Sequence, residues 1–142
     1  MQLEAQWVVG FVDGQGSFHI TIKADETNSL GSQILVRFTV VKHECDVKIL
    51  YALKAYFGCG TVRKTDENTY VYVVTKLDHL VDRICPFFMR HTFKTHTNVH
   101  FRKFRTVCLL MHDKKHLTQE GFDKIRAIAL SMRRMRAHTT PI

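Results

Sequence analysis

The feature that most constrains the fold of this chain is a switch of hydrophobic period close to Gly14 and Gly16. Apolar side chains in residues 3–12 recur at the three-to-four-residue spacing of one helix face. From residue 17 to residue 23, apolar and polar side chains alternate instead, which predicts a strand with one buried face. We therefore expect a helix that ends among the glycines and leads directly into a strand.

The same periodicities predict the rest of the chain. We expect a second strand over Gln33–Lys42, a helix over Asp46–Phe57 that ends at Gly58, and a hairpin of Thr61–Lys64 and Thr69–Val74. A short helix should follow, which begins at a capping-box-like Thr75 and runs to Pro86. Two further helices complete the chain, and Thr118 should cap the second of them. This order predicts an α+β fold with one antiparallel sheet and extra C-terminal helices.

Composition favours a single domain that binds a polyanion. The chain has 142 residues and a formal net charge of +8, a balance that most often indicates nucleic acid. No apolar run reaches the roughly 20 residues that a membrane span needs. The four cysteines form no CxxC pair and the N-terminus lacks a signal pattern, so we expect an intracellular protein without a membrane partner.

One face of the predicted sheet is polar and carries no acid. The strand positions that we expect to point away from the core, and to bind nucleic acid, are His19, Thr21, Lys23, Gln33, Arg37, Thr39, Thr61, Arg63, Tyr70 and Tyr72. Most of these side chains donate or accept hydrogen bonds, as residues that read base edges and phosphates do. A plain solvated face is the alternative, and the two tyrosines leave RNA stacking open as well.

The period switch lies within a recognisable motif. Residues 7–18 read WVVGFVDGQGSF, which resembles the G-F-V-D-G-(D or E)-G-S-F signature of the LAGLIDADG homing endonucleases. The tail from His116 to Met132 is also similar to the closing helix of that family, so the resemblance covers nearly the whole chain. It implies the αββαββα LAGLIDADG homing-endonuclease fold, with a saddle-shaped antiparallel sheet, over residues 1–142 as a single domain.

The resemblance also implies an assembly. Gly10 and Gly14 lie four apart on one helical face, where a second helix or another part of the same chain could approach closely. The chain has one motif, and family members of this length resemble homodimers whose motif helices pack about a two-fold axis. The implied dimer interface consists of Trp7, Gly10, Phe11, Asp13 and Gly14. The implied target is a long pseudo-palindromic double-stranded DNA site.

The chemistry that the resemblance implies is hydrolysis of phosphodiesters with Mg²⁺ or another divalent cation, in the service of group I intron homing. The metal position of the motif matches Gln15, beside Gly14, and basic residues of the catalytic centre match Lys42 and Lys94. Asp13 matches an earlier, structural acid of the motif. A neutral amide at position 15 should weaken metal binding sharply. Either an inactivating substitution or a natural loss of cleavage fits this glutamine.

Several other readings stay open. An intron maturase that binds RNA, or a DNA-binding protein that does not cut, would also fit Gln15. His96 and His100 are spaced as zinc ligands on a helix can be, but no cysteine pair or third ligand accompanies them. Basic side chains that could follow phosphates, or merely face solvent, are Arg102, Lys103, Arg105 and the run Arg133, Arg134 and Arg136.

Overall fold

The computed structural model describes the backbone of residues 1–139 and the side chains of residues 1–133. Its helices and strands are α1 (Ala5–Gln15), β1 (Gly16–Ala24), β2 (Ser32–His43), α2 (Val47–Phe57), β3 (Thr61–Asp66), β4 (Thr69–Val74), α3 (Leu77–His79), α4 (Cys85–Arg90), α5 (Thr97–His112) and α6 (Gln119–Thr139). This element order confirms the predicted α+β class and the direct passage from helix to strand. No helix in the described part of the chain is both long and apolar enough to cross a membrane.

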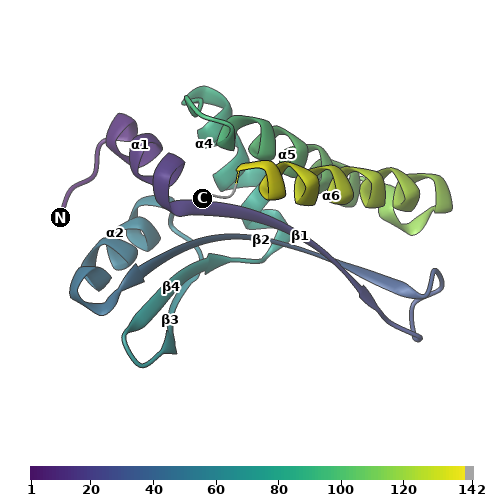
Figure 1. Cartoon of the computed structure of the whole chain (residues 1–142), viewed down its shortest axis with the longest axis horizontal. Helices are drawn as coiled ribbons and strands as arrows, with labels where there is room; N and C mark the ends of the chain where they lie inside the picture. The colour runs from purple at the N-terminus through teal and green to yellow at the C-terminus, as the bar shows by residue number, and fades with distance from the viewer. Residues whose placement is uncertain (140–142) are drawn as a thin grey trace.

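The four strands form one antiparallel sheet in the order β1-β2-β4-β3. Strand β1 pairs with β2 from Gly16↔Val40 to Ala24↔Ser32. Strand β4 pairs only with the C-terminal half of β2, over Phe38–His43, so the first half of β2 has no neighbour on that side. The sheet arches, and α4, α5 and α6 lie over its convex side, which leaves the concave side open in this view (Figure 1).

Aromatic side chains hold the helices to the convex side. Phe18 of β1 stacks on Phe38 of β2 with ring centroids 5.0 Å apart, and it also contacts Phe101 and Phe104 of α5. All four rings are at most 2% exposed. Full burial of one such side chain stabilises a fold by about 1.5–3 kcal/mol, so this cluster is a principal reason why the helices cover this face and not the other.

Two predicted helix boundaries were wrong. Thr75 caps nothing, because α3 begins after Lys76 and has no side-chain cap. The helical path also passes Pro86 and continues through α4 to Arg90. A π-helical turn over Leu80–Ile84 precedes the proline. Pro86 then lies at the start of α4, directly after this π turn. The predicted caps at Gly58, which has a φ of 71°, and at Thr118 are confirmed.

Candidate nucleic-acid interface and catalytic centre

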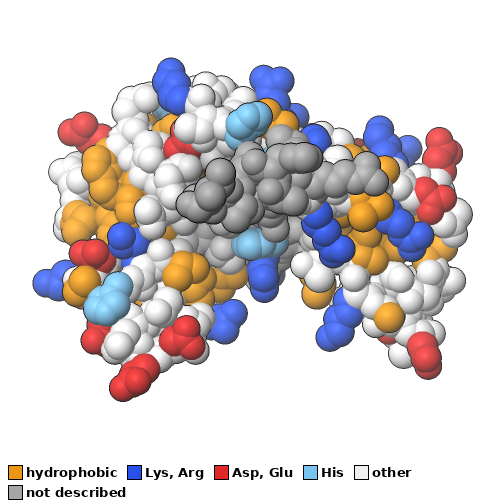
Figure 2. Space-filling model, viewed as in Figure 1, with side chains coloured by type: hydrophobic (Ala, Val, Ile, Leu, Met, Phe, Trp, Pro, Cys, Tyr) orange, Lys and Arg blue, Asp and Glu red, His pale blue; other side chains and the backbone are white. Residues whose placement is uncertain are grey.

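The concave face of the sheet carries the predicted polar side chains from three of its strands. Strand pairing places His19 opposite Arg37 and Lys23 opposite Gln33, and it places Arg63 of β3 beside Val71 of β4. The predicted residues that point away from the helices are His19, Thr21, Lys23, Gln33, Arg37, Thr39, Thr61 and Arg63. None is acidic. Figure 2 shows the lower side of the molecule hollowed between two arms, with Lys and Arg side chains on both.

Two of the predicted contacts were wrong, because Tyr70 and Tyr72 point toward the helices. Tyr72 is fully buried in the core, and its hydroxyl donates to the carbonyl of Cys59 at 2.8 Å. Burial raises the pKa of that phenol. Tyr72 pairs with core residue Val40, and Tyr70, two positions earlier, is half-buried on the same side. Because residues 69–74 are large or apolar at nearly every position, alternation could not show which side of this strand faces the core.

The true outward positions of β4 and β2 include aliphatic side chains that the polar pattern missed. Val71 and Val73 are nearly buried but lie outside the main core cluster, because they pair with outward-facing Val41 and Thr39 of β2. Val41 and Leu35 are exposed. Strict alternation from Gln33 through Arg37 and Thr39 would have placed both on this face, so the signal was present in the sequence.

Hydrogen bonding orders the middle of this face. His19 Nε2 and Thr39 Oγ1 lie 3.0 Å apart across the β1–β2 pair. Thr39 is only 9% exposed, so its hydroxyl has little contact with water and bonds to the histidine instead. Arg37, Lys23 and Arg63 are exposed on either side of this pair. The arrangement presents a preorganised centre with cations around it, as suits a polyanionic partner.

The motif places Gln15 at the last position of α1, where its carboxamide is exposed. Gly16 follows with a φ of −91° and ψ of 161°, and its N–H donates to the carbonyl of Val12. A Cβ at position 16 would lie 2.6 Å from Val12 Cγ1 and 2.9 Å from Val12 O. Only glycine therefore allows the helix to turn into the strand here, which fixes where Gln15 stands.

Asp13 ties the end of α1 to the loop that precedes α5. Its carboxylate accepts hydrogen bonds from the amides of Lys94 and Thr95, at 3.0 and 3.3 Å, and from the Thr95 hydroxyl. The Thr97 hydroxyl donates to the Asp13 carbonyl at 3.2 Å. Burial raises the pKa of Asp13, but these hydrogen bonds outweigh it and leave the pKa below its ordinary value. Asp13 is thus an ionised anchor within its own chain.

Different contacts position the two predicted lysines. Lys94, exposed and bound through its amide to Asp13, is held beside the end of α1 that carries Gln15. Lys42 lies at the end of β2, with its Nζ 5.8 Å from the Phe11 ring centroid and 3.7 Å from the Asp46 carboxylate. A hollow lined by Gly16, Ser17, Phe18, Thr97 and His100 adjoins the same junction.

The oxygen ligands at the junction of α1 and β1 do not fit Mg²⁺ in the chain as it stands. The described residues hold no group of three or more His, Cys, Asp or Glu that could bind a metal ion, His96 and His100 included. The carboxylate nearest to Gln15 in the sequence, Asp13, is engaged with the 94–97 loop. What remains at the junction is the neutral amide of Gln15 and the carbonyl of Gly14, whereas Mg²⁺ is usually held by one or two carboxylates.

One face of α1 is largely open among the described residues. Trp7 and Phe11 stack with centroids 4.9 Å apart and an angle of 11° between their planes, and Trp7 is 47% exposed. A Cβ added at Gly10 or at Gly14 would meet nothing within 4 Å. The two glycines therefore serve no close packing inside this chain.

The basic stretches are less alike than their sequence suggests. Lys103 donates to the Ser131 hydroxyl at 2.8 Å and links α5 to α6. Arg102 and Arg133 are exposed, while Arg105 is half-buried. The side chains of Arg134 and Arg136 lie outside the described residues.

Comparison with known proteins gives consistent matches. The family model described as LAGLIDADG endonuclease matches residues 8–108. "Probable intron-encoded endonuclease 2" of Neurospora crassa is 28% identical over 120 residues, which are 84% of this chain and 25% of that protein. The chain spans about a quarter of the length of the first curated relatives that it matches.

Solved structures match over most of the chain. The crystal structure of the homing endonuclease I-TnaI is 42% identical, with a TM-score of 0.88, and covers 92% of this chain and 88% of that one. I-SmaMI bound to an uncleaved DNA target in the presence of calcium ions is 32% identical, with a TM-score of 0.88 over 92% of this chain and 45% of that one.

Proposed function

Because this chain belongs to the LAGLIDADG endonuclease family, we propose that it is one subunit of a site-specific homing endonuclease. Its 142 residues act as a single domain, and two copies bind a long pseudo-palindromic duplex DNA. The observation that carries this proposal is the set of outward cationic and hydrogen-bonding side chains from three strands on the concave face, none of which is acidic. Asp and Glu side chains lie only farther out on this side, at the lower ends of the two arms in Figure 2.

Assembly of two copies through α1 accounts for the exposed Trp7 and the open space at Gly10 and Gly14. Trp7 and Phe11 supply apolar area, and Gly10 and Gly14 let a second helix approach the backbone. The two concave faces then continue one another, and a two-fold axis through the paired helices makes the DNA half-sites inverted repeats. Asp13 is adjacent to this contact, but its carboxylate acts within its own chain.

At the centre of the assembly, the two junctions bring Gln15, Gly14 and Lys94 toward the DNA backbone. Lys94 provides a positive charge for a phosphate, and Asp13 holds its loop in place. A catalytic divalent cation, Mg²⁺ or another, belongs at position 15 by family resemblance, but two neutral amides bind such an ion weakly. The chain as it stands therefore binds its site and cleaves it poorly.

An RNA-binding maturase is less well supported. Sequence-specific RNA recognition relies on aromatic side chains that stack on unpaired bases. Tyr70 and Tyr72 were the candidates, and both point away from the open face. A DNA-binding protein without cleavage is the second candidate, and Gln15 is the observation that favours it.

The test joins selection of a binding site to a gain of function. Duplexes selected from a random library by the unchanged protein are incubated with Mg²⁺ and either that protein or Gln15→Glu, which adds one carboxylate per chain. We expect similar binding by both, and cleavage of both strands that is at least tenfold faster with Gln15→Glu.

Gln33→Glu is the matched control, since it places the same new charge elsewhere on the concave face. It should weaken binding without any gain in cleavage. Rapid cleavage by the unchanged protein would overturn the role given to Gln15. Failure to select any duplex would overturn the DNA-binding proposal itself.

A further inference from the structure

Two exposed aliphatic side chains interrupt the polar concave face. Leu35 is 43% exposed and Val41 is 46% exposed, and both point outward from β2. Single exposed aliphatic residues are common on protein surfaces and need no explanation. These two differ because Val41 lies beside Val71 on the same face, and Leu35 borders a hollow at the edge of β2.

Val41 stands on an apolar base. It pairs directly with Val71, whose neighbour two positions along the strand, Val73, pairs with Thr39. Val71 and Val73 are 5% and 8% exposed, so Val41 is the accessible tip of this aliphatic group. Arg63 of β3 pairs with the other side of Val71 and closes the group with a positive charge.

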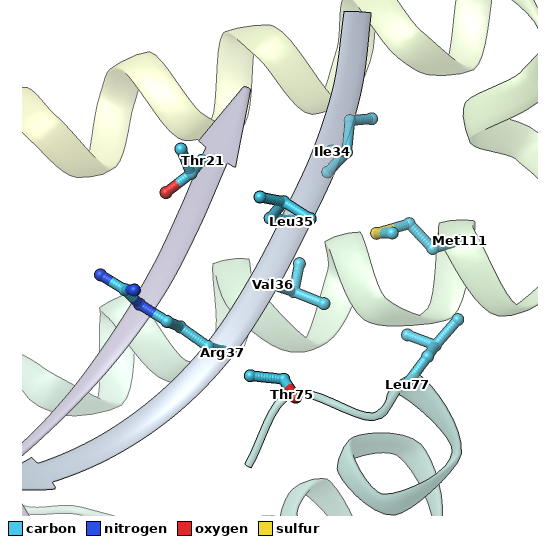
Figure 3. A pocket seen from close by; sticks show the side chains of 8 residues that line it. All are labelled: Thr21, Ile34, Leu35, Val36, Arg37, Thr75, Leu77 and Met111. Carbon is cyan, nitrogen blue, oxygen red and sulfur yellow. The ribbon is translucent and has the colours of Figure 1, made fainter. Parts of the chain in front are cut away.

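Leu35 stands beside a hollow of about 370 Å³ at the unpaired edge of β2. Figure 3 shows Leu35 and Arg37 on the same side of β2 as Thr21 of β1, while Ile34 and Val36 point toward Met111 of α5. Leu77 also lines the hollow. Leu35 is therefore an apolar residue of this lining that faces the concave side, where it lies beside its strand partner Thr21 and Arg37.

The chemistry of the DNA grooves identifies the contact. In the major groove, thymine alone among the four bases presents a methyl group, and apolar side chains contact it. We propose that Leu35 and Val41 each contact a thymine methyl group in every half-site, an inference that rests on the proposed DNA binding. Arg37 and Thr39, between them on the strand, then face the intervening base pairs.

The spacing of the two residues sets the spacing of the two thymines. They lie six residues apart on one strand, about 20 Å at roughly 3.3 Å per residue. At about 3.4 Å per base pair along the helix axis, this distance corresponds to about six base pairs for a strand that runs parallel to the axis. Each half-site should therefore carry thymines about six base pairs apart, on either strand of the duplex.

The experiment removes the methyl groups without changing base pairing. Random duplex libraries made with dTTP are selected by the unchanged protein, and the recovered site is resynthesised with deoxyuridine in place of single thymines. At two positions per half-site, about six base pairs apart, the substitution should weaken binding about fourfold. This is the loss expected when the burial of one methyl group is removed. At the other thymines it should have little effect.

Variants assign each methyl group to its residue. Leu35→Ala should abolish the effect of deoxyuridine at one position only, and Val41→Ser, which removes both γ-methyl groups, should abolish it at the other. Leu117→Ala removes another exposed leucine, at 54%, that lies away from the sheet, and it should leave both effects intact.

A selected site that binds equally well with deoxyuridine throughout would overturn this inference and leave DNA binding standing. Sensitivity to deoxyuridine that neither variant removes would overturn the assignment to Leu35 and Val41. If no duplex is selected at all, the proposed function fails and this inference with it.

Discussion

At the scale of single residues, Asp13 and Gln15 lie two positions apart and have different tasks. Asp13 turns into its own chain and binds the loop that carries Lys94, while Gln15 is exposed at the end of the helix. Both carboxylate oxygens of Asp13 already accept hydrogen bonds from Lys94 and Thr95 of the same chain, which directs the group toward that loop. The acid that the family places at position 15 is therefore not replaced by its neighbour.

We predict that Asp13→Ala frees the 94–97 loop. Loss of charge-assisted hydrogen bonds should lower the free energy of unfolding by about 2 kcal/mol, measured by urea denaturation. Hydrogen exchange at the Lys94 and Thr95 amides should become faster. Asp25→Ala is the matched control, because it removes an aspartate that bonds only within its own turn, to Thr27. Unchanged exchange at Lys94 in Asp13→Ala would show that the loop is held by other contacts.

The lowered pKa of Asp13 predicts how this contribution varies with pH. In the folded state the carboxyl titrates below the ordinary value of 3.8, so the unfolded chain binds a proton more readily. The stabilisation is complete at pH values above 3.8 and is lost as the pH falls through the lowered pKa. The difference in unfolding free energy between the unchanged protein and Asp13→Asn should therefore be constant near neutrality and shrink in acid. A difference that grows in acid would contradict this assignment.

Tyr72 tests the corrected side of β4. We predict that Tyr72→Phe lowers the free energy of unfolding by about 1 kcal/mol, because the Cys59 carbonyl loses its buried donor. Affinity for duplex DNA should not change, because the ring lies beneath the sheet. Tyr51→Phe, at an exposed position on α2, should change neither quantity. A loss of DNA affinity with unchanged stability would return Tyr72 to the interface.

At the scale of elements, α1 has two sides with opposite requirements. Val8, Val9 and Val12 pack into the core, and the glycine at position 16 is needed by the chain's own packing. Gly10 and Gly14, on the other side, cost the helix up to about 1 kcal/mol each relative to alanine and return no contact within the chain. A second helix that packed closely against this side would use the space that the two glycines leave.

We predict that Gly10→Leu prevents dimerisation while leaving the monomer folded. The leucine has open space in one chain but blocks close approach of a second helix, and it also favours the helix. Sedimentation equilibrium should show a dimer for the unchanged protein and a monomer, at least as stable to heat, for Gly10→Leu. Ala55→Leu, another exposed small-to-large change on a helix, should leave the dimer intact. Equal association of all three proteins would exclude α1 as the interface.

At the scale of the whole molecule, charge and shape act together. The net charge of +8 by itself is no more than a bias toward polyanions. The proposed binding surface arises because the sheet arches and its helices cover one side only. Two copies joined through α1 would carry twice that charge along one continuous groove. Association should therefore be strongly dependent on salt.

We predict that Lys23→Ala and Arg63→Ala, made together, reduce the salt dependence of DNA binding. If each cation neutralises one phosphate, the slope of log affinity against log salt should fall by about four in a dimer, since each lost contact contributes about 0.9. Lys124→Ala, on exposed α6, should leave the slope unchanged. An unchanged slope with a relaxed base preference would instead place the two cations on base edges.

Much of the fold was predictable because local patterns and tertiary packing agree. The strands β1 and β2, the helix α2 with its Gly58 cap and the Thr118 cap all follow from alternation, helical spacing and glycine. Prediction failed at Tyr70 and Tyr72, because this strand has no alternation of apolar and polar residues that shows which side faces the core. It also failed at Pro86, because the helical path continues through the preceding π turn and past the proline. The outward Leu35 and Val41 were missed because hydrophobic character was equated with burial.

The sequence by itself determined the element order, the polar face of β1 and β2 and the absence of an acid at position 15, since each depends on residues close together in the chain. Only the tertiary structure decided that Asp13 holds the Lys94 loop, that the tyrosines of β4 belong to the core and that Gly10 and Gly14 face open space. These outcomes depend on which segments meet across 80 or more residues and on the register between strands. Hydrophobic packing of the whole chain sets both, and no local pattern records them.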